Sequence, residues 1–272
     1  NPEFQSNPSY RFEVLDDLRD HMRDEGVVNP AVVKAVVARV LEVMGTPSTT
    51  RVRFRSSSNI EDDVQFNGAG LYSSTSGCPE DELDADEEGP SHCDPTRENE
   101  RTITRALKRV WRSLWNFGAF EERNYFQISQ DDAVMAVLVN RTFIDEASNG
   151  VAFTGNPQNP FDRRFVITAQ QGEESVVSPE PGIEAEKNLL EIVDGVVNRI
   201  IRSLPSTLVP PGTFVVSEEQ LEELGRLMAY IDANFPVDVG ELDPSQVLLD
   251  MEFKFMPDGK LAVKQVRPFL LA

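Results

Sequence analysis

The chain has 272 residues, 40% of them hydrophobic, which suffices to bury the core of one large domain or two modest ones. Its 46 acidic and 26 basic residues give a net charge of −20, which disfavours nucleic acid as a partner unless the basic residues gather on one face. No apolar run approaches the ~20 residues that cross a bilayer and the first residues do not resemble a signal peptide, so we expect a soluble, cytoplasmic protein with no membrane partner.

The first helix and the first strand are predicted before residue 56. We interpret residues 1–5 as a cloning remnant. Asn29 suits a helix N-cap, Pro30 the first helical position and Gly45 the C-terminal end, so a helix is predicted between them. A strand-like run at residues 51–55 then leads into the polar stretch RFRSSSNIEDDVQFNGAGLY, whose arginine and glycines are candidates for contact with an anion.

Residues 78–98 are acidic and contain several prolines and glycines, which predicts an exposed, poorly ordered insertion. Solvation explains its carboxylates better than calcium binding, because no D-x-[DN]-x-[DN]-G loop is present. Its two cysteines, Cys78 and Cys93, lack CxxC spacing and a histidine pair for a zinc site. A disulfide between them is one option, although the cytosol disfavours it. His92 is expected to be exposed.

The middle of the chain mixes helices and strands without regular alternation, which favours an α+β fold over a doubly wound sheet. A helix is predicted over residues 97–117, a hairpin turning at Asp194-Gly195, and a helix to about Asn234 that begins with the capping box of Ser217 and Gln220. The first of these helices has one apolar stripe, made of Leu107, Trp111, Leu114 and Trp115. Further strands are predicted at 133–139, 150–154 and 164–169.

The last fifty residues predict a hairpin around the turn Pro257-Asp258-Gly259. Alternation places Asp250, Glu252 and Lys254 on one face, and the apolar side chains on the other, namely Val247, Leu249, Met251, Phe253 and Phe255. A four-residue turn would pair Phe255 with Lys260, and would set Asp250 opposite Gln265 and Glu252 opposite Val263. The face of the two carboxylates would then also carry Leu261, Val263, Gln265 and Arg267.

Two carboxylates beside an amide and an arginine suit a magnesium-bound nucleotide. Mg²⁺ takes one or two carboxylates and leaves its other positions to water and phosphates, while an arginine fork grips phosphate oxygens. The alternative is a solvent-facing strand pair whose charges have no ligand.

Five motifs, in order over roughly residues 50–268, resemble the nucleotide-binding domain of phosphoenolpyruvate synthases and pyruvate phosphate dikinases. RFRSSSNIEDDVQFNGAG is similar to VRSSA-x-x-ED-x-x-x-x-SFAG, and SLWNFGAFEER to SLFN-x-RA-x-x-YR. The later three are NGVAFTGNP, AQQGEESVV and LDMEFKFMPDGKLAVKQVRP, similar to SGV-x-FT-x-(D/N)P, QGE-x-VV and D-x-E…GKL…Q-x-RP. The stretch NGAGLYSS is closer to glucan, water dikinases, which use the same domain.

The resemblance implies an ATP-grasp-like fold that holds ATP and Mg²⁺ between two α+β lobes, with one lobe incomplete here. Residues 6–272 would be the C-terminal larger part of such an ATP-binding domain. Arg55 and Arg267 would act on nucleotide phosphate in catalysis, and Asp250 and Glu252 would hold Mg²⁺. Other implied nucleotide-binding residues are Asn67, Gly68, Gly70, Asn140, Gln265 and either Glu173 or Glu174. Asn140 and Thr142 replace a glutamine and a methionine of the family pattern.

Three hypotheses remain at this point. The chain is the ATP-binding part of a longer phosphotransferase that phosphorylates a histidine on another domain, with pyruvate or a glucan as later acceptor. In that case we expect the chain to be inactive alone and to work with the phosphohistidine and pyruvate-binding domains of its parent. Alternatively, the domain is a nucleotide sensor without a transfer step, or an acidic interaction module.

Overall fold

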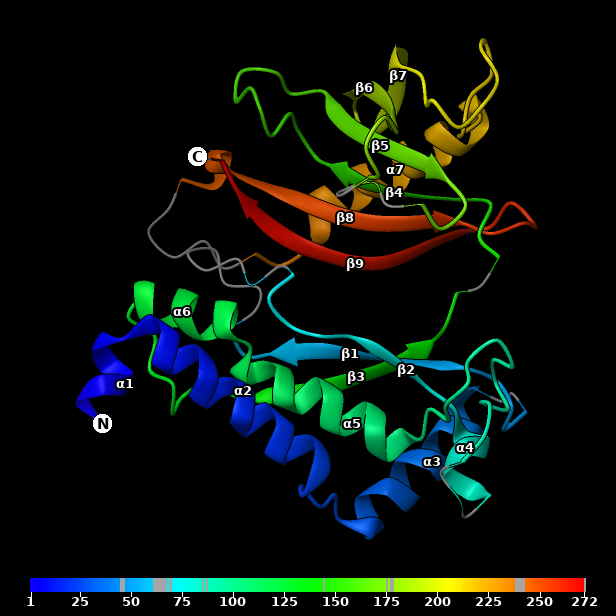
Figure 1. Cartoon of the computed structure of the whole chain (residues 1–272). Coiled ribbons are helices and arrows are strands. Elements are labelled where there is room, and N and C mark those ends of the chain that lie inside the picture. Colours follow the sequence, from blue (N-terminus) through cyan, green and yellow to red (C-terminus); the bar gives the residue numbers. More distant parts are fainter. Residues whose placement is uncertain are drawn as a thin grey trace. The chain divides into compact units, whose positions relative to one another are not determined.

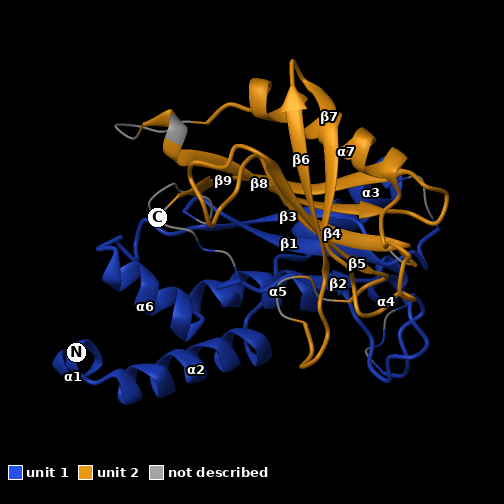
Figure 2. Cartoon of the chain, turned by 90° about the horizontal axis from the view of Figure 1, so that it is seen from above, with its two compact units in different colours: residues 1–142 blue, residues 143–272 orange. Residues whose placement is uncertain are grey.

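The computed structural model places residues 1–272 in two compact units, residues 1–142 and residues 143–272 (Figures 1 and 2). It describes every residue except 45–46, 61–67, 69, 85, 87, 144, 175, 177–178, 238–242 and 272. Both units combine helices with antiparallel sheet, which confirms the predicted α+β class. In the described part of the chain, no helix is both long enough and apolar enough to span a bilayer.

Unit 1 is built on a small antiparallel sheet with the strand order β2-β1-β3. Central β1 pairs with both neighbours, and Arg55 of β1 lies opposite Leu138 of β3. The strands are β1 (Val52–Ser58), β2 (Thr75–Gly77) and β3 (Met135–Arg141). The helices are α1 (Pro2–Ser6), α2 (Pro8–Asp24), α3 (Pro30–Met44), α4 (Pro79–Leu83), α5 (Ile103–Arg112) and α6 (Phe117–Tyr125), with a 3-10 turn η1 (Ser113–Trp115).

One face of β1 supplies the core of unit 1. Val52 and Phe54 are fully buried and pack against the apolar sides of α3 and α5. Asn29 caps α3 as expected, because its side chain accepts a hydrogen bond from the Ala31 N–H at 2.9 Å. Arg53 and Arg55 alternate with the buried residues and are therefore half-buried on the opposite face.

The predicted helix over residues 97–117 is shorter and is broken. Its helical part begins at Ile103, turns to 3-10 geometry at Ser113 and gives way to α6 at Phe117. The expected apolar stripe is accordingly divided between two clusters. Leu107 and Trp111 pack with α3 and β1, whereas Leu114 and Trp115 pack with Tyr72 and Ala133.

The prediction of an exposed, poorly ordered insertion at residues 78–98 is wrong for the described part of that segment. Cys78 and Cys93 form a disulfide. Asp81 is only 1% exposed, because its carboxylate accepts the N–H groups of His92 and Arg101 at 2.8 Å each. The Glu82 carboxylate accepts the Thr104 N–H at 2.8 Å, at the N-terminus of α5. Acidic side chains here satisfy backbone donors, which is why a charged segment folds.

Unit 2 contains an antiparallel sheet of order β7-β6-β5-β4-β8-β9, with helix α7 packed against one face (Figure 1). Its strands are β4 (Ser148–Phe153), β5 (Phe165–Gln171), β6 (Glu186–Val193), β7 (Val196–Leu204), β8 (Val247–Phe255) and β9 (Leu261–Leu270). Helix α7 spans Glu218–Asn234, and a 3-10 turn η2 (Pro244–Gln246) precedes β8. The predicted strands near 150–154 and 164–169 correspond to β4 and β5.

Two local predictions in unit 2 are confirmed. Asp194 and Gly195 both have positive φ, of 52° and 76°, as a two-residue hairpin turn between β6 and β7 requires. Ser217 and Gln220 form the capping box at the start of α7, each side chain accepting the other's backbone N–H.

Gly150 makes room for the core of unit 2. A Cβ atom at this position would lie 2.4 Å from the Phe253 ring and 2.5 Å from the carbonyl oxygen of Thr168. Phe253 and Phe255 are almost fully buried and pack beneath α7 with Met251. Because these side chains occupy one face of β8, the intervening residues are directed to the other face.

We predict that loss of the disulfide destabilises unit 1. Cys78 and Cys93 are 15 residues apart, and a closed loop of that length stabilises a fold by about 3 kcal/mol in the chain-entropy account. A Cys78→Ser/Cys93→Ser variant should lose about 2–3 kcal/mol in urea unfolding, and reductant should lower the melting temperature of the wild type but not of the variant. An equal response of both proteins to reductant would contradict the pairing.

We also predict that Gly150→Ala destabilises unit 2 by about 1–3 kcal/mol, since the added methyl group overlaps a ring and a carbonyl that cannot both move. Helical Gly118 is the matched control, because a Cβ there meets only Leu71, at 3.8 Å. Thermal unfolding should show Gly118→Ala unchanged or more stable. Equal effects of the two substitutions would remove the packing explanation.

Candidate functional site

The face of β8 opposite the core carries polar side chains in alternation. Leu249, Met251, Phe253 and Phe255 are buried beneath α7 or among their neighbours, whereas Asp250, Glu252 and Lys254 share the other face. Sequence alternation predicted this division. Asp250 is nevertheless 4% exposed, so its carboxylate is desolvated and needs charged or hydrogen-bonding partners.

The predicted hairpin of β8 and β9 is present, but its register differs from the prediction. Asp250 lies opposite Arg267 and Glu252 opposite Gln265, whereas we expected Gln265 and Val263 at these positions. Phe255 pairs with Leu261 and not with Lys260. A register shift follows Glu252, where Phe253 pairs with Val263. A bulge at Lys264 accounts for this irregularity, and bulges are invisible to an argument that counts residues from the turn.

The shift changes which β9 residues share the carboxylate face. Directly opposed residues lie on the same side of a sheet, so Gln265 and Arg267 accompany Glu252 and Asp250 as predicted. Leu261 and Val263, which we expected on that face, instead oppose core residues Phe255 and Phe253. Leu261 packs against the core cluster accordingly.

Two ion pairs neutralise the carboxylates. Arg267 donates to Oδ2 of Asp250 through Nε at 2.8 Å and Nη2 at 2.7 Å. Lys264 Nζ lies 2.7 Å from Oε2 of Glu252, and both side chains of this pair are more than a quarter exposed. Lys264 was missed from the sequence because only the bulge brings it to this carboxylate.

A third cation continues the face toward the end of β8. Lys254 pairs with buried Glu146 and lies 5.9 Å from the centre of the Phe143 ring. Asn149 of β4 lies opposite Lys254, and its side chain donates to the carbonyl oxygens of Gly172 and Glu174 at 2.7 and 2.8 Å. These bonds fix the backbone that bears the two candidate glutamates.

The two glutamates differ in exposure. Glu173 is exposed and Glu174 is half-buried. The choice between them for nucleotide contact stays a prediction, as does their role.

In unit 1, two of the predicted residues share one face of the small sheet. Asn140 of β3 lies directly opposite Arg53 of β1, and Arg55 lies two positions further along β1. The Oδ1 atom of Asn140 is buried and accepts no hydrogen bond among the described residues. It is therefore an acceptor available to a ligand.

Arg53 was not singled out from the sequence, although it alternates with Arg55. Burial lowers the pKa of the Arg53 guanidinium, and repulsion from the neighbouring cations Arg55, Arg109, Arg51 and Arg101 lowers it further. A bound anion would relieve that repulsion. The face of β1 that carries Arg53 and Arg55 is thus electropositive within a strongly acidic chain.

The glycine loop that follows β1 is described only in part. Gly68 is buried, its carbonyl oxygen accepts the Leu71 N–H at 3.1 Å, and Gly70 has a φ of +78° that favours glycine. Asn67 lies outside the described residues. Whether this loop approaches a phosphate stays a prediction.

A separate cavity of about 580 Å³ lies on unit 1 among α2, α5 and β2. None of the sequence-predicted site residues lines it, so we do not assign the nucleotide to it. Its cationic lining consists of Arg23, Arg101, Arg105, Lys108, Arg109 and Arg112.

The residues of the β8–β9 face suit a magnesium ion. Asp250 and Glu252 offer hard carboxylate oxygens from one side of one strand, which is a set that Mg²⁺ takes while it keeps water and phosphate in its other positions. Arg267 presents a planar fork of N–H donors next to them, of the kind that binds carboxylate or phosphate oxygens in pairs.

The comparisons with known proteins agree with these features. No curated protein sequence matches the chain significantly. The sequence model of the family described as pyruvate phosphate dikinase, AMP/ATP-binding domain, matches residues 16–271, and this span includes both units' candidate residues. The α+β architecture is of the ATP-grasp-like kind that such a domain requires. The chain therefore belongs to the pyruvate phosphate dikinase AMP/ATP-binding domain family.

Proposed function

We propose that the chain binds Mg-ATP, with Asp250 and Glu252 as metal ligands and with Arg267 and Gln265 at the phosphates. The observation that carries the proposal is the register of β8 and β9, which sets each carboxylate directly opposite one of the phosphate-binding candidates. Membership of an AMP/ATP-binding family supports the nucleotide as the ligand.

The present ion pairs indicate how the face would respond to ligand. Glu252 is neutralised by Lys264, a half-exposed cation on a flexible stem, so the carboxylate can exchange that partner for a metal ion. The released ammonium would then lie close to the incoming phosphate oxygens. Asp250 is more deeply buried and would keep Arg267 in place as a fork. When bound, Mg²⁺ would neutralise the charge that develops on the phosphate oxygens during transfer.

Arg55 and Asn140 would contribute from unit 1. Arg55 would contact a phosphate, and the unpaired Oδ1 of Asn140 would accept a hydrogen bond from an amino group such as that of adenine. That one nucleotide contacts residues of both units is a prediction from the family resemblance.

We further propose that the parent protein transfers a phosphoryl group from ATP to a histidine on another domain, with pyruvate or a glucan as later acceptor. The chain alone would bind but not turn over ATP. The alternative is a nucleotide-sensing module without transfer, or an interaction module. Incubation of the complete parent protein with γ-labelled and β-labelled ATP separates these alternatives, because only a phosphotransferase acquires acid-labile label on histidine.

The cytoplasmic location expected from the sequence stays a prediction. The Cys78–Cys93 disulfide is of the kind that persists in oxidising environments and is uncommon in the cytosol of mesophiles. Alkylation of free thiols in intact cells, before lysis, would establish whether the pair is oxidised where the protein resides.

We predict that Arg55→Ala and Glu252→Gln each weaken Mg-ATP binding by about 10- to 150-fold, since a lost charge-assisted contact costs roughly 1.5–3 kcal/mol. Glu252 is preferred to Asp250 for this test because it is more exposed and its amide variant leaves no buried charge unpaired. Calorimetric titration of Mg-ATP into the chain measures both effects.

Arg226→Ala and Glu222→Gln are matched controls, because this exposed ion pair lies on α7 and away from the candidate residues. They should bind Mg-ATP as the wild type does. If the site variants bind as tightly as these controls, Arg55 and Glu252 are structural residues and the assignment is wrong. The double variant tests a shared ligand, since coupled losses that fail to add indicate one nucleotide contacted by both side chains.

A further inference from the structure

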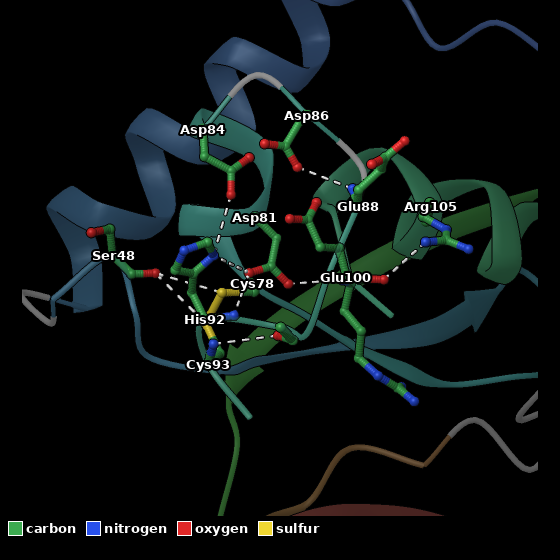
Figure 3. A network of polar contacts seen from close by, with 12 residues as sticks. Ser48, Cys78, Asp81, Asp84, Asp86, Glu88, His92, Cys93, Glu100 and Arg105 are labelled. Carbon is green, nitrogen blue, oxygen red and sulfur yellow. Dashed lines mark hydrogen bonds and ion pairs between the residues drawn. A yellow bond between two sulfur atoms is a disulfide. The ribbon is translucent and has the colours of Figure 1, made fainter. Parts of the chain in front are cut away.

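The disulfide-closed segment of unit 1 holds a group of carboxylates that the nucleotide proposal does not use. Ligand oxygens of Asp84, Asp86 and Glu100 all lie within 4.8 Å of one another. Figure 3 shows these side chains gathered beside the bond between Cys78 and Cys93. Among the described residues, none of the three carboxylates forms an ion pair with a lysine or an arginine.

Glu100 is the member of this group that requires an explanation. The residue is 3% exposed, and its Oε2 atom is buried without a hydrogen-bond partner in the described part of the chain. Burial raises the pKa of the Glu100 carboxyl, and the charges of Asp84, Asp81 and Asp86 raise it further. A buried acceptor that faces two other carboxylates is costly unless a proton or a cation satisfies it.

Asp81 and His92 separate this group from the surrounding backbone. Both oxygens of Asp81 already accept backbone N–H groups, so it is not available as a ligand. Asp84 is contacted only by the His92 ring, with Nδ1 at 3.2 Å from Oδ2, and neither of its oxygens accepts a well-formed hydrogen bond. The oxygens open to a cation are therefore those of Asp84, Asp86 and Glu100.

The local sequence supplies these oxygens in a recognisable order. Residues 84–89 are DADEEG, which differs from the calcium-loop pattern D-x-[DN]-x-[DN]-G only by glutamate at the fifth position. Gly89, at the sixth position, has a φ of +98°, the conformation for which such loops use glycine. Glu100 would take the part of the distant glutamate that closes a calcium loop.

We propose that Asp84, Asp86 and Glu100 form a binding site for a calcium ion. Oxygens on opposite sides of Ca²⁺ are about 4.6–5.2 Å apart, given Ca–O distances of ~2.3–2.6 Å, so the three oxygens can reach a common ion. Glu88 follows in the loop and is exposed, so its carboxylate can complete the set.

Calcium fits this site better than the other divalent cations. The ligands are all carboxylate oxygens on an irregular loop, whereas Mg²⁺ demands a near-ideal octahedron and Zn²⁺ favours nitrogen and sulfur. The two sulfur atoms nearby are joined in the disulfide and are not ligands. The ion would replace the proton that a buried Glu100 otherwise retains.

The test uses the 272-residue chain after treatment with chelator and its removal. Thermal unfolding is followed at pH 7.5 during titration with CaCl₂, in parallel with MgCl₂ and ZnCl₂. We expect 5 mM CaCl₂ to raise the melting temperature by roughly 2–8 °C, as for a site with Kd near 10⁻⁴–10⁻³ M. Isothermal titration should give one calcium ion per chain.

Glu100→Gln distinguishes a metal site from a merely acidic surface. Without calcium this variant should melt higher than the wild type, because it removes a buried charge, yet it should lose the response to calcium. Asp86→Asn should weaken the response, and Glu98→Gln, an exposed residue of the same segment, should keep it. Glu252→Gln should also keep it, which separates this site from the proposed nucleotide-metal site.

The pH dependence follows from the raised pKa of Glu100. The folded protein holds this proton more tightly than the unfolded chain, so the calcium-free protein should lose stability as the pH rises through the folded pKa. Calcium should oppose that loss, and its affinity should fall as the pH is lowered. No response of the wild type to calcium, an equal response of Glu100→Gln, or an equal response to Mg²⁺ or Zn²⁺ would overturn the proposal.

Discussion

The two-residue period of β8 is the constraint on which the candidate site depends. Burial of Met251, Phe253 and Phe255 under α7 leaves no freedom in where the intervening side chains point. Asp250 and Glu252 are therefore held on one face by the core and not by contacts of their own. Gly150 is part of the same constraint, because only a residue without a side chain lets the Phe253 ring lie against β4.

The same division by alternation organises unit 1. Val52 and Phe54 belong to the core, so Arg53 and Arg55 lie together on the other face of β1. Two cations on one strand repel each other unless an anion is near, and burial lowers the pKa of Arg53 in the same direction. In a chain with a net charge of −20, this local excess of positive charge is a specific feature of the fold.

Sequence reasoning was most successful where a local rule decides the structure. Caps, the Asp194-Gly195 turn and the faces of β8 follow from residue types at fixed spacing. It failed where a single irregular residue or a distant contact decides. The Lys264 bulge moved the partners of both carboxylates by two positions, and composition made residues 78–98 resemble solvated loop although Asp81 is buried by backbone donors. Neither the disulfide nor the isolation of Glu100 has a signature in the sequence.

The central claim is that the two carboxylates of β8 hold the metal of a bound nucleotide. A crystal of the chain grown with Mn²⁺ and a non-hydrolysable ATP analogue tests it directly, because manganese is located by its anomalous scattering. We predict a manganese peak coordinated by carboxylate oxygens of both Asp250 and Glu252, with Arg267 on a phosphate oxygen. A nucleotide bound with its manganese away from these two side chains would contradict the account.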